Sequence, residues 1–159
     1  MPIDHELSYR WLRAFLFGSL WSLAVGMPIF AVLHHGFDDN LFRRWLQAFI
    51  ITLVIEVPFY VALARGIVPA WRAALAGAAC SFITHPVLVY FWRPFCQQHG
   101  FSYTEYIVIG ELAVGVIETF TFFALARPVR LVRALACSFV ANAASYGGGN
   151  LLHWLGLWR

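Results

Sequence analysis

Residues 106–123 form an apolar stretch long enough to cross a lipid bilayer, yet it contains two carboxylates, Glu111 and Glu118. Because these lie seven positions apart, they share one face of a helix. A charge at membrane depth costs roughly 2.5–3.5 kcal/mol on insertion scales. A span that keeps two acidic residues therefore points to a functional site, a proton path or a specific contact between helices.

Composition indicates that the bilayer is the solvent of this chain. Hydrophobic residues make up 61% and charged residues 12% of the 159 residues, whereas soluble domains carry about 25% charged residues. Mean hydropathy is +0.71. The eleven basic residues are scattered arginines, which we interpret as topology signals and lipid headgroup contacts, with no nucleic acid as a partner. We expect one integral membrane domain over residues 1–159, an all-α polytopic transmembrane helix bundle.

Five apolar segments are predicted to span the membrane, because each has about the 20 residues needed to cross a hydrocarbon core of roughly 30 Å. They cover residues 14–33, 46–64, 69–92, 104–125 and 132–155. Gly147, Gly148 and Gly149 predict a break in the last span. With the N-terminus inside, seven arginines lie on the cytoplasmic side and four on the outer side. This bias favours an N-in/C-out, multi-pass protein of the cytoplasmic (inner) membrane.

Polar residues inside the predicted spans define a candidate polar core. They are Glu56, His85, Glu111, Glu118, Asn142 and Ser145. A rise of about 1.5 Å per residue places Glu56, Glu118 and Asn142 near the midplane, and His85 and Glu111 together in the outer third. Three spans also show a polar or small face at helical spacing: Gly77, Ser81, His85; Glu111, Gly115, Glu118; and Ser138, Asn142, Ser145, Gly149. These faces are predicted to converge in the interior.

This polar core favours movement of a proton, a cation or a small solute across the membrane. Glu56, Glu111 and Glu118 would form a ladder of titrating groups, with His85 near its outer end. A last span broken by glycine would match the discontinuous helices of transporters. Because one chain of this length is small for a transporter, we expect a homo-oligomer or an association with other membrane subunits.

Two alternatives stay open at this point. His85 and Glu111 are candidate ligands of a divalent metal, since imidazole and carboxylate suit Zn²⁺, Fe²⁺ or Mn²⁺. The protein would then be a metal-dependent, membrane-embedded enzyme or its subunit, although the sequence lacks the Glu-x-x-His pairs of di-metal bundles and its catalytic residues are unknown. In the other alternative, the buried polar groups tie helices together in a structural or assembly subunit of a membrane complex.

The order of the short motifs carries a resemblance. Glu56-Val57-Pro58 comes first, then Thr84-His85-Pro86, then Glu111 with Glu118, then Asn142 with Ser145. This order resembles that of small uncharacterised multi-pass membrane proteins of bacteria and archaea, over residues 46–149. The resemblance implies a shared polar core and adds no reaction.

Overall fold

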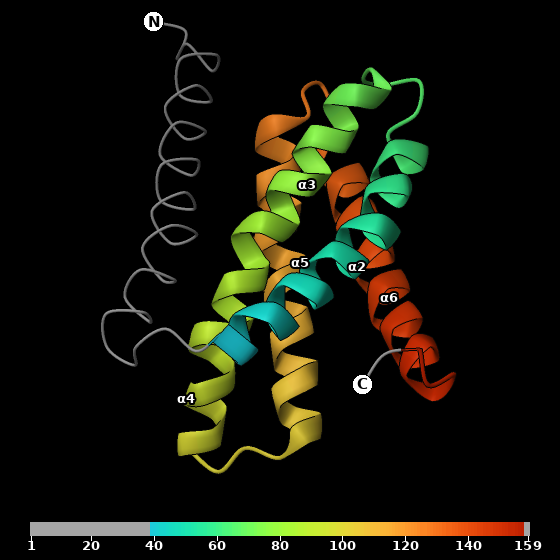
Figure 1. Cartoon of the computed structure of the whole chain (residues 1–159). Coiled ribbons are helices and arrows are strands. Elements are labelled where there is room, and N and C mark those ends of the chain that lie inside the picture. The colour runs from blue at the N-terminus through green and yellow to red at the C-terminus, as the bar shows by residue number, and fades with distance from the viewer. Residues whose placement is uncertain (1–38, 158–159) are drawn as a thin grey trace, which may run out of the picture.

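The computed structural model describes residues 39–157, and every regular element in this part of the chain is helical. The long helices are α2 (Asp39–Leu63), α3 (Ala70–Val87), α5 (Tyr103–Leu125) and α6 (Leu131–Trp154). A π-helical turn, η1 (Leu88–Trp92), and the short α4 (Arg93–Gln98) extend α3. The four long helices pack side by side in a bundle, with α3 and α5 next to each other (Figure 1). The predicted all-α class is confirmed.

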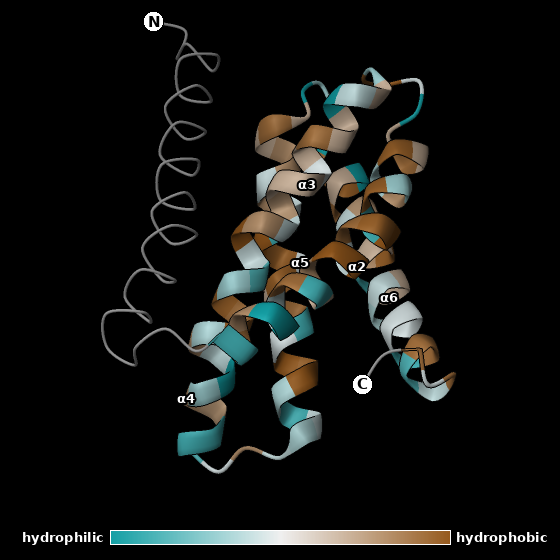
Figure 2. Cartoon of the chain, viewed as in Figure 1, coloured by the Kyte–Doolittle hydropathy of each residue, from teal (hydrophilic) through white to brown (hydrophobic). Residues whose placement is uncertain are grey.

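Three helical stretches of the described chain are long and apolar enough to cross a membrane: Asp39–Leu63, Ala70–Gln98 and Tyr103–Leu125. Large apolar side chains project from their surfaces, among them Val54, Leu75 and Leu112, each more than half exposed. Figure 2 shows apolar residues distributed along all the long helices rather than gathered only in the interior. This exterior suits lipid. Of the five predicted spans, the one at 14–33 lies outside the described residues, and α6 is not among the three stretches.

Three predicted boundaries were wrong. The second helix begins at Asp39 rather than near residue 46, so residues 39–44 are its first turns and not a loop. The third runs through η1 into α4, because Pro94 lies in the first turn of α4, where its missing N–H is not needed. The glycines at 147–149 do not break the last helix, which continues to Trp154.

A closely packed apolar cluster fills one end of the bundle, where α2 and α5 finish and α3 and α6 begin. Its buried members are Tyr60, Ala64, Val68, Ala73, Ala76, Cys80, Phe122, Ala126, Val129, Ala134, Cys137 and Ala141. Many of these side chains are small, which lets the helices approach closely. We call this end the packed end. The opposite end, where α5 begins and α6 finishes, is called the open end.

Candidate functional site

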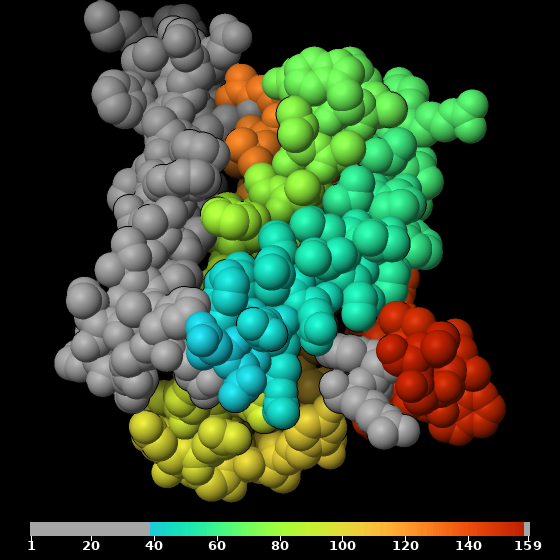
Figure 3. Space-filling model, viewed as in Figure 1, coloured from blue at the N-terminus to red at the C-terminus, as the bar shows by residue number. Residues whose placement is uncertain are grey.

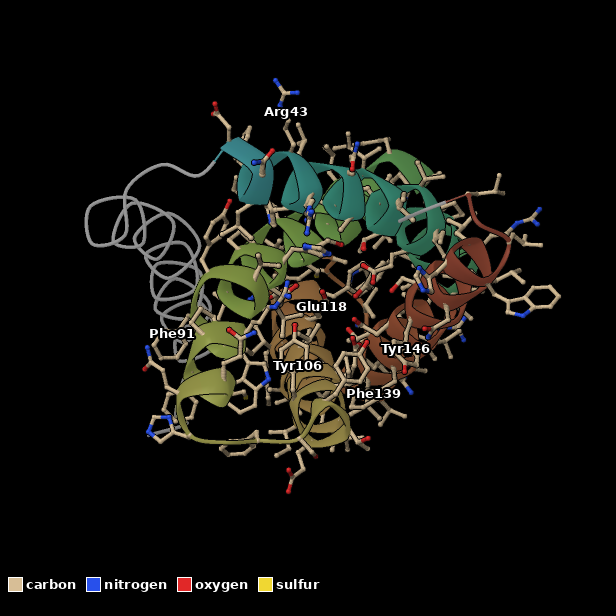
Figure 4. The ribbon with its side chains drawn as sticks, turned by 60° about the horizontal axis from the view of Figure 1, so that its bottom comes forward. Arg43, Phe91, Tyr106, Glu118, Phe139 and Tyr146 are labelled. Carbon is tan, nitrogen blue, oxygen red and sulfur yellow. The ribbon has the colours of Figure 1, made fainter. Side chains whose placement is uncertain are left out.

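Glu118 is the centre of the buried polar site. It is 1% exposed and lies in the middle of the bundle when viewed from the open end (Figure 4). One carboxylate oxygen, Oε1, accepts a hydrogen bond from the Thr84 hydroxyl of α3 at 2.8 Å. The other, Oε2, accepts from the Tyr60 hydroxyl of α2 at 2.9 Å and from the Asn142 amide of α6. Glu118 on α5 thus holds a side chain from each of the other three long helices.

Glu56 forms a second buried site beside it. It is 1% exposed, and its two carboxylate oxygens accept from two serine hydroxyls. Ser81 of α3 donates to Oε2 at 2.7 Å, and Ser145 of α6 donates to Oε1 at 2.6 Å. The two carboxyl groups are near enough to repel each other when both are ionised. Every hydrogen-bond partner of these two glutamates in the described chain is a neutral group.

The hydroxyl groups around the carboxylates share one property: each has a second oxygen within reach. Thr84 Oγ1 lies 3.1 Å from the Cys80 carbonyl oxygen. Ser81 Oγ lies 3.4 Å from the Gly77 carbonyl oxygen, and Ser145 Oγ lies 3.1 Å from the Asn142 carbonyl oxygen. These are contacts one helical turn back, which serine and threonine make readily.

The Asn142 amide is arranged differently from these hydroxyls, and Tyr60 resembles them. The amide of Asn142 has two hydrogens, and both are in use, one on Glu118 and the other on the Ser138 carbonyl oxygen at 2.9 Å. The Tyr60 oxygen lies 3.2 Å from Ser138 Oγ. Because a phenol has one hydrogen, Tyr60 can donate either to Glu118 or to Ser138 Oγ, so it also has a second acceptor within reach. The Asn142 amide is thus the one fixed donor to Glu118. Thr84 at Oε1 and Tyr60 at Oε2 can each turn to another oxygen.

His85 lies outside the two carboxylate sites. Its Nε2 atom is 3.1 Å from Thr52 Oγ1 of α2, and its ring meets Phe49 edge-on at 5.7 Å between centroids. The other ring nitrogen, Nδ1, is buried and has no hydrogen-bond partner. No contact between His85 and Glu111 is found, although both were predicted in the outer third. A depth along the membrane fixes height only, and His85 faces α2.

Glu111 is partly exposed. Within residues 39–157, no three His, Cys, Asp or Glu side chains gather in a group that could hold a metal ion. The predicted metal ligands His85 and Glu111 therefore have no third ligand in this part of the chain. The metal-dependent alternative gains no support.

Sequence reasoning missed Tyr60 and Thr84 as partners of Glu118, and Thr52 as the partner of His85. The signal was present in their spacing, because Tyr60 and Thr52 lie one turn on either side of Glu56 and therefore share its face. Thr84 lies three residues after Ser81, which was recognised as part of a polar face. Attention to carboxylates and histidines alone left these neutral hydroxyl groups out.

The comparisons with known proteins add no relative: no family model, no curated protein and no solved structure matches the chain. The fold and the site therefore define a general class of protein and no particular family. The chain is an apolar α-helical protein suited to a membrane, with two glutamates buried among its long helices. The resemblance to small multi-pass membrane proteins stays a prediction.

Proposed function

We propose that this protein moves protons across a membrane, with Glu118 and Glu56 as the groups that bind and release them. The observation that carries the proposal is the second oxygen beside each hydroxyl donor. A buried carboxyl group can change its protonation state only if its neighbours can exchange donor and acceptor roles. Here the hydroxyl groups can do so by rotating, with no movement of a helix.

At Glu118 the exchange can take place at Oε1, the oxygen that Thr84 holds. When the carboxylate is ionised, Thr84 donates to Oε1. When a proton binds at Oε1, the Thr84 hydroxyl turns to the Cys80 carbonyl oxygen, and its own oxygen accepts the hydrogen bond of the new acid O–H. Oxygen Oε2 keeps its bonds from Tyr60 and Asn142 throughout.

Glu56 is built for the same exchange at either of its oxygens. Ser145 can turn to the Asn142 carbonyl oxygen and Ser81 to the Gly77 carbonyl oxygen. The repulsion between the two carboxyl groups favours states in which at least one of them carries a proton. A proton that leaves one glutamate therefore makes the other a better acceptor.

The proposal takes a proton rather than a metal ion as the bound species, because residues 39–157 hold no group of three His, Cys, Asp or Glu side chains that could bind a metal ion. The proposal keeps two predictions from the sequence. The protein lies in the inner membrane, and it works as a homo-oligomer or together with other membrane subunits.

Helix tying is the second candidate function, because the same hydrogen bonds join α5 to three other helices. Glu118→Gln separates the two. A glutamine can place its amide nitrogen at the Oε1 position, donate to Thr84 and keep its oxygen on Tyr60 and Asn142. The variant thus resembles the protonated glutamate and is expected to fold, but it cannot release a proton.

The experiment measures proton flux in liposomes with an enclosed pH-sensitive dye and an imposed potassium diffusion potential. The wild-type protein is expected to raise flux above that of empty liposomes, and Glu118→Gln to abolish the increase. Glu105→Gln is the matched control, because Glu105 is an exposed glutamate of the same helix and its loss should leave flux unchanged. Wild-type flux equal to that of empty liposomes, or undiminished flux in Glu118→Gln, would overturn the proposal and leave helix tying.

A further inference from the structure

Burial is distributed unevenly along the two helices that carry Glu56 and its partner Ser145. On α2, none of residues 39–55 is buried, and Glu56 is the first buried residue. On α6, Asn142 is the last buried residue, and none of residues 143–154 is buried. On α2 and α6 the carboxylate sites therefore lie where burial begins, whereas α3, α4 and α5 keep buried residues further toward the open end, among them Pro86, Cys96 and Gly110.

The packed end offers a proton no hydrogen-bonding route. Beyond the level of Tyr60 and Ser138, its buried side chains are apolar, and Ala64, Ala126 and Ala134 are each 0% exposed. The buried threonine nearest to this end, Thr121, donates to the carbonyl oxygen of Ile117 on its own helix. Among residues 39–157, no buried polar side chain therefore links this end of the bundle to Glu118 beyond Tyr60, Ser138 and Thr121.

The open end differs because its interior polar groups are partly exposed. Ser145 contacts Glu56 and is only half-buried. Glu111, two helical turns before Glu118 on the same face of α5, is partly exposed, and so is His85. The last turns of α6 also stand out from the rest of the surface (Figure 3).

We propose that Glu56 and Glu118 load from one side of the membrane only, the side at which α5 begins, and that the packed end is a closed gate. This inference rests on the proposed function, because one-sided loading matters only if the glutamates carry protons. Transport then requires the packed end to open in a second state. The closed gate also explains why the structure shows a polar interior without a continuous polar path. The structure is then the state of the carrier that faces the open end.

Single-cysteine variants test the access of water from each side. The chain has three cysteines, all free and buried: Cys80, Cys96 and Cys137. Replacing Cys80 and Cys96 by alanine leaves Cys137 as a native reporter inside the packed end. Replacing all three by alanine and adding Ser145→Cys places a thiol of similar size to serine beside Glu56. Gln98→Cys in the same cysteine-free background marks the open side, because Gln98 is exposed at the end of α4.

A membrane-impermeant maleimide is applied to sealed vesicles of either orientation. Ser145→Cys is expected to react in the same vesicles as Gln98→Cys and in no others, and Cys137 is expected to react in neither until the protein is unfolded in detergent. Labelling of Cys137 in intact vesicles, or labelling of Ser145→Cys from both sides or from neither, would overturn the proposal. Thr52→Cys, on the same side of Glu56, replaces Ser145→Cys if that variant does not fold.

The labelling result is independent of proton flux, so the two proposals can fail separately. One-sided labelling without wild-type flux would refute proton movement and keep the one-sided site. Flux together with labelling of Cys137 would refute the closed gate and keep the carboxylates as the proton-binding groups.

Discussion

Gly77→Ala should damage the site indirectly, by pushing on Tyr60. Gly77 itself has no side chain that contacts either glutamate. A Cβ atom at Gly77 would lie 2.7 Å from Cδ2 and 2.8 Å from Cγ of the Tyr60 ring. Ordinary contacts begin at 3.4 Å, so the ring must move by about 0.7 Å, the difference between 3.4 and 2.7. Tyr60 cannot move freely, because it is fully buried and its ring lies 4.6 Å from that of Phe122.

The size of the effect follows from that shift. If the Tyr60 hydroxyl moves with the ring away from Glu118, a bond of 2.9 Å lengthens to about 3.6 Å, past the limit of a hydrogen bond. Overpacking of a closely packed interior costs about 1–3 kcal/mol, and loss of a hydrogen bond to a charged group about 1.5–3 kcal/mol. The gain of alanine over glycine in a helix offsets about 1 kcal/mol. A net loss of roughly 2–4 kcal/mol is expected, together with loss of proton flux.

The assay is reversible unfolding of the purified protein in mixed micelles of mild and denaturing detergent, followed by helical circular dichroism. Gly147→Ala is the matched control, because a Cβ atom there meets nothing within 4 Å and the same change should be neutral or stabilising. Tyr60→Phe completes a double-mutant cycle: it should cost less in the Gly77→Ala background, where the bond to Glu118 is already broken. Equal stability of Gly77→Ala and Gly147→Ala would refute the reasoning.

The remaining predictions concern the partners of Glu118. Thr84→Val should abolish proton flux and cost about 1–3 kcal/mol of stability, because it removes the group that exchanges donor and acceptor roles at Oε1. Thr84→Ser should keep both the flux and the stability. Equal flux in the two variants would contradict the exchange. Asn142→Leu should cost about 2–4 kcal/mol, since it removes one of the three donors to Glu118 and the side-chain donor to the Ser138 carbonyl oxygen. Asn150→Leu, at an exposed asparagine of the same helix that bonds only the Tyr146 carbonyl oxygen, should be nearly silent in the same unfolding assay.

Helical periodicity was enough to predict the elements that hold the site. The predicted segment 104–125 differs from α5 by one residue at its start. The helix begins after its N-cap, Ser102, and ends before the connection at residues 126–130. The turn between α2 and α3 lies where Gly66 supplies a positive φ of 79°. Polar spacing also placed Glu118 and Asn142 at one depth, and the structure joins them by a hydrogen bond.

What the sequence left open has physical causes. Spacing gives the height of a residue and its face on its own helix, but not the helix that it faces, so His85 was grouped with Glu111 while it contacts Thr52. The glycines at 147–149 predicted a break because glycine weakens an isolated helix. In the bundle, Gly148 instead lets α6 approach α2, since a Cβ atom there would lie 2.6 Å from Ile55 Cδ1.

The neutrality of the site argues for reversible protonation over permanent tying of helices. Had an arginine been the partner of Glu118, each proton uptake would leave a buried charge without its counter-ion, and breaking a buried pair in this way costs about 3–5 kcal/mol. Thr84, Tyr60 and Asn142 hold Glu118 without that penalty. A shell of neutral groups, some of which can reverse their hydrogen bonds, keeps both states of the glutamate satisfied.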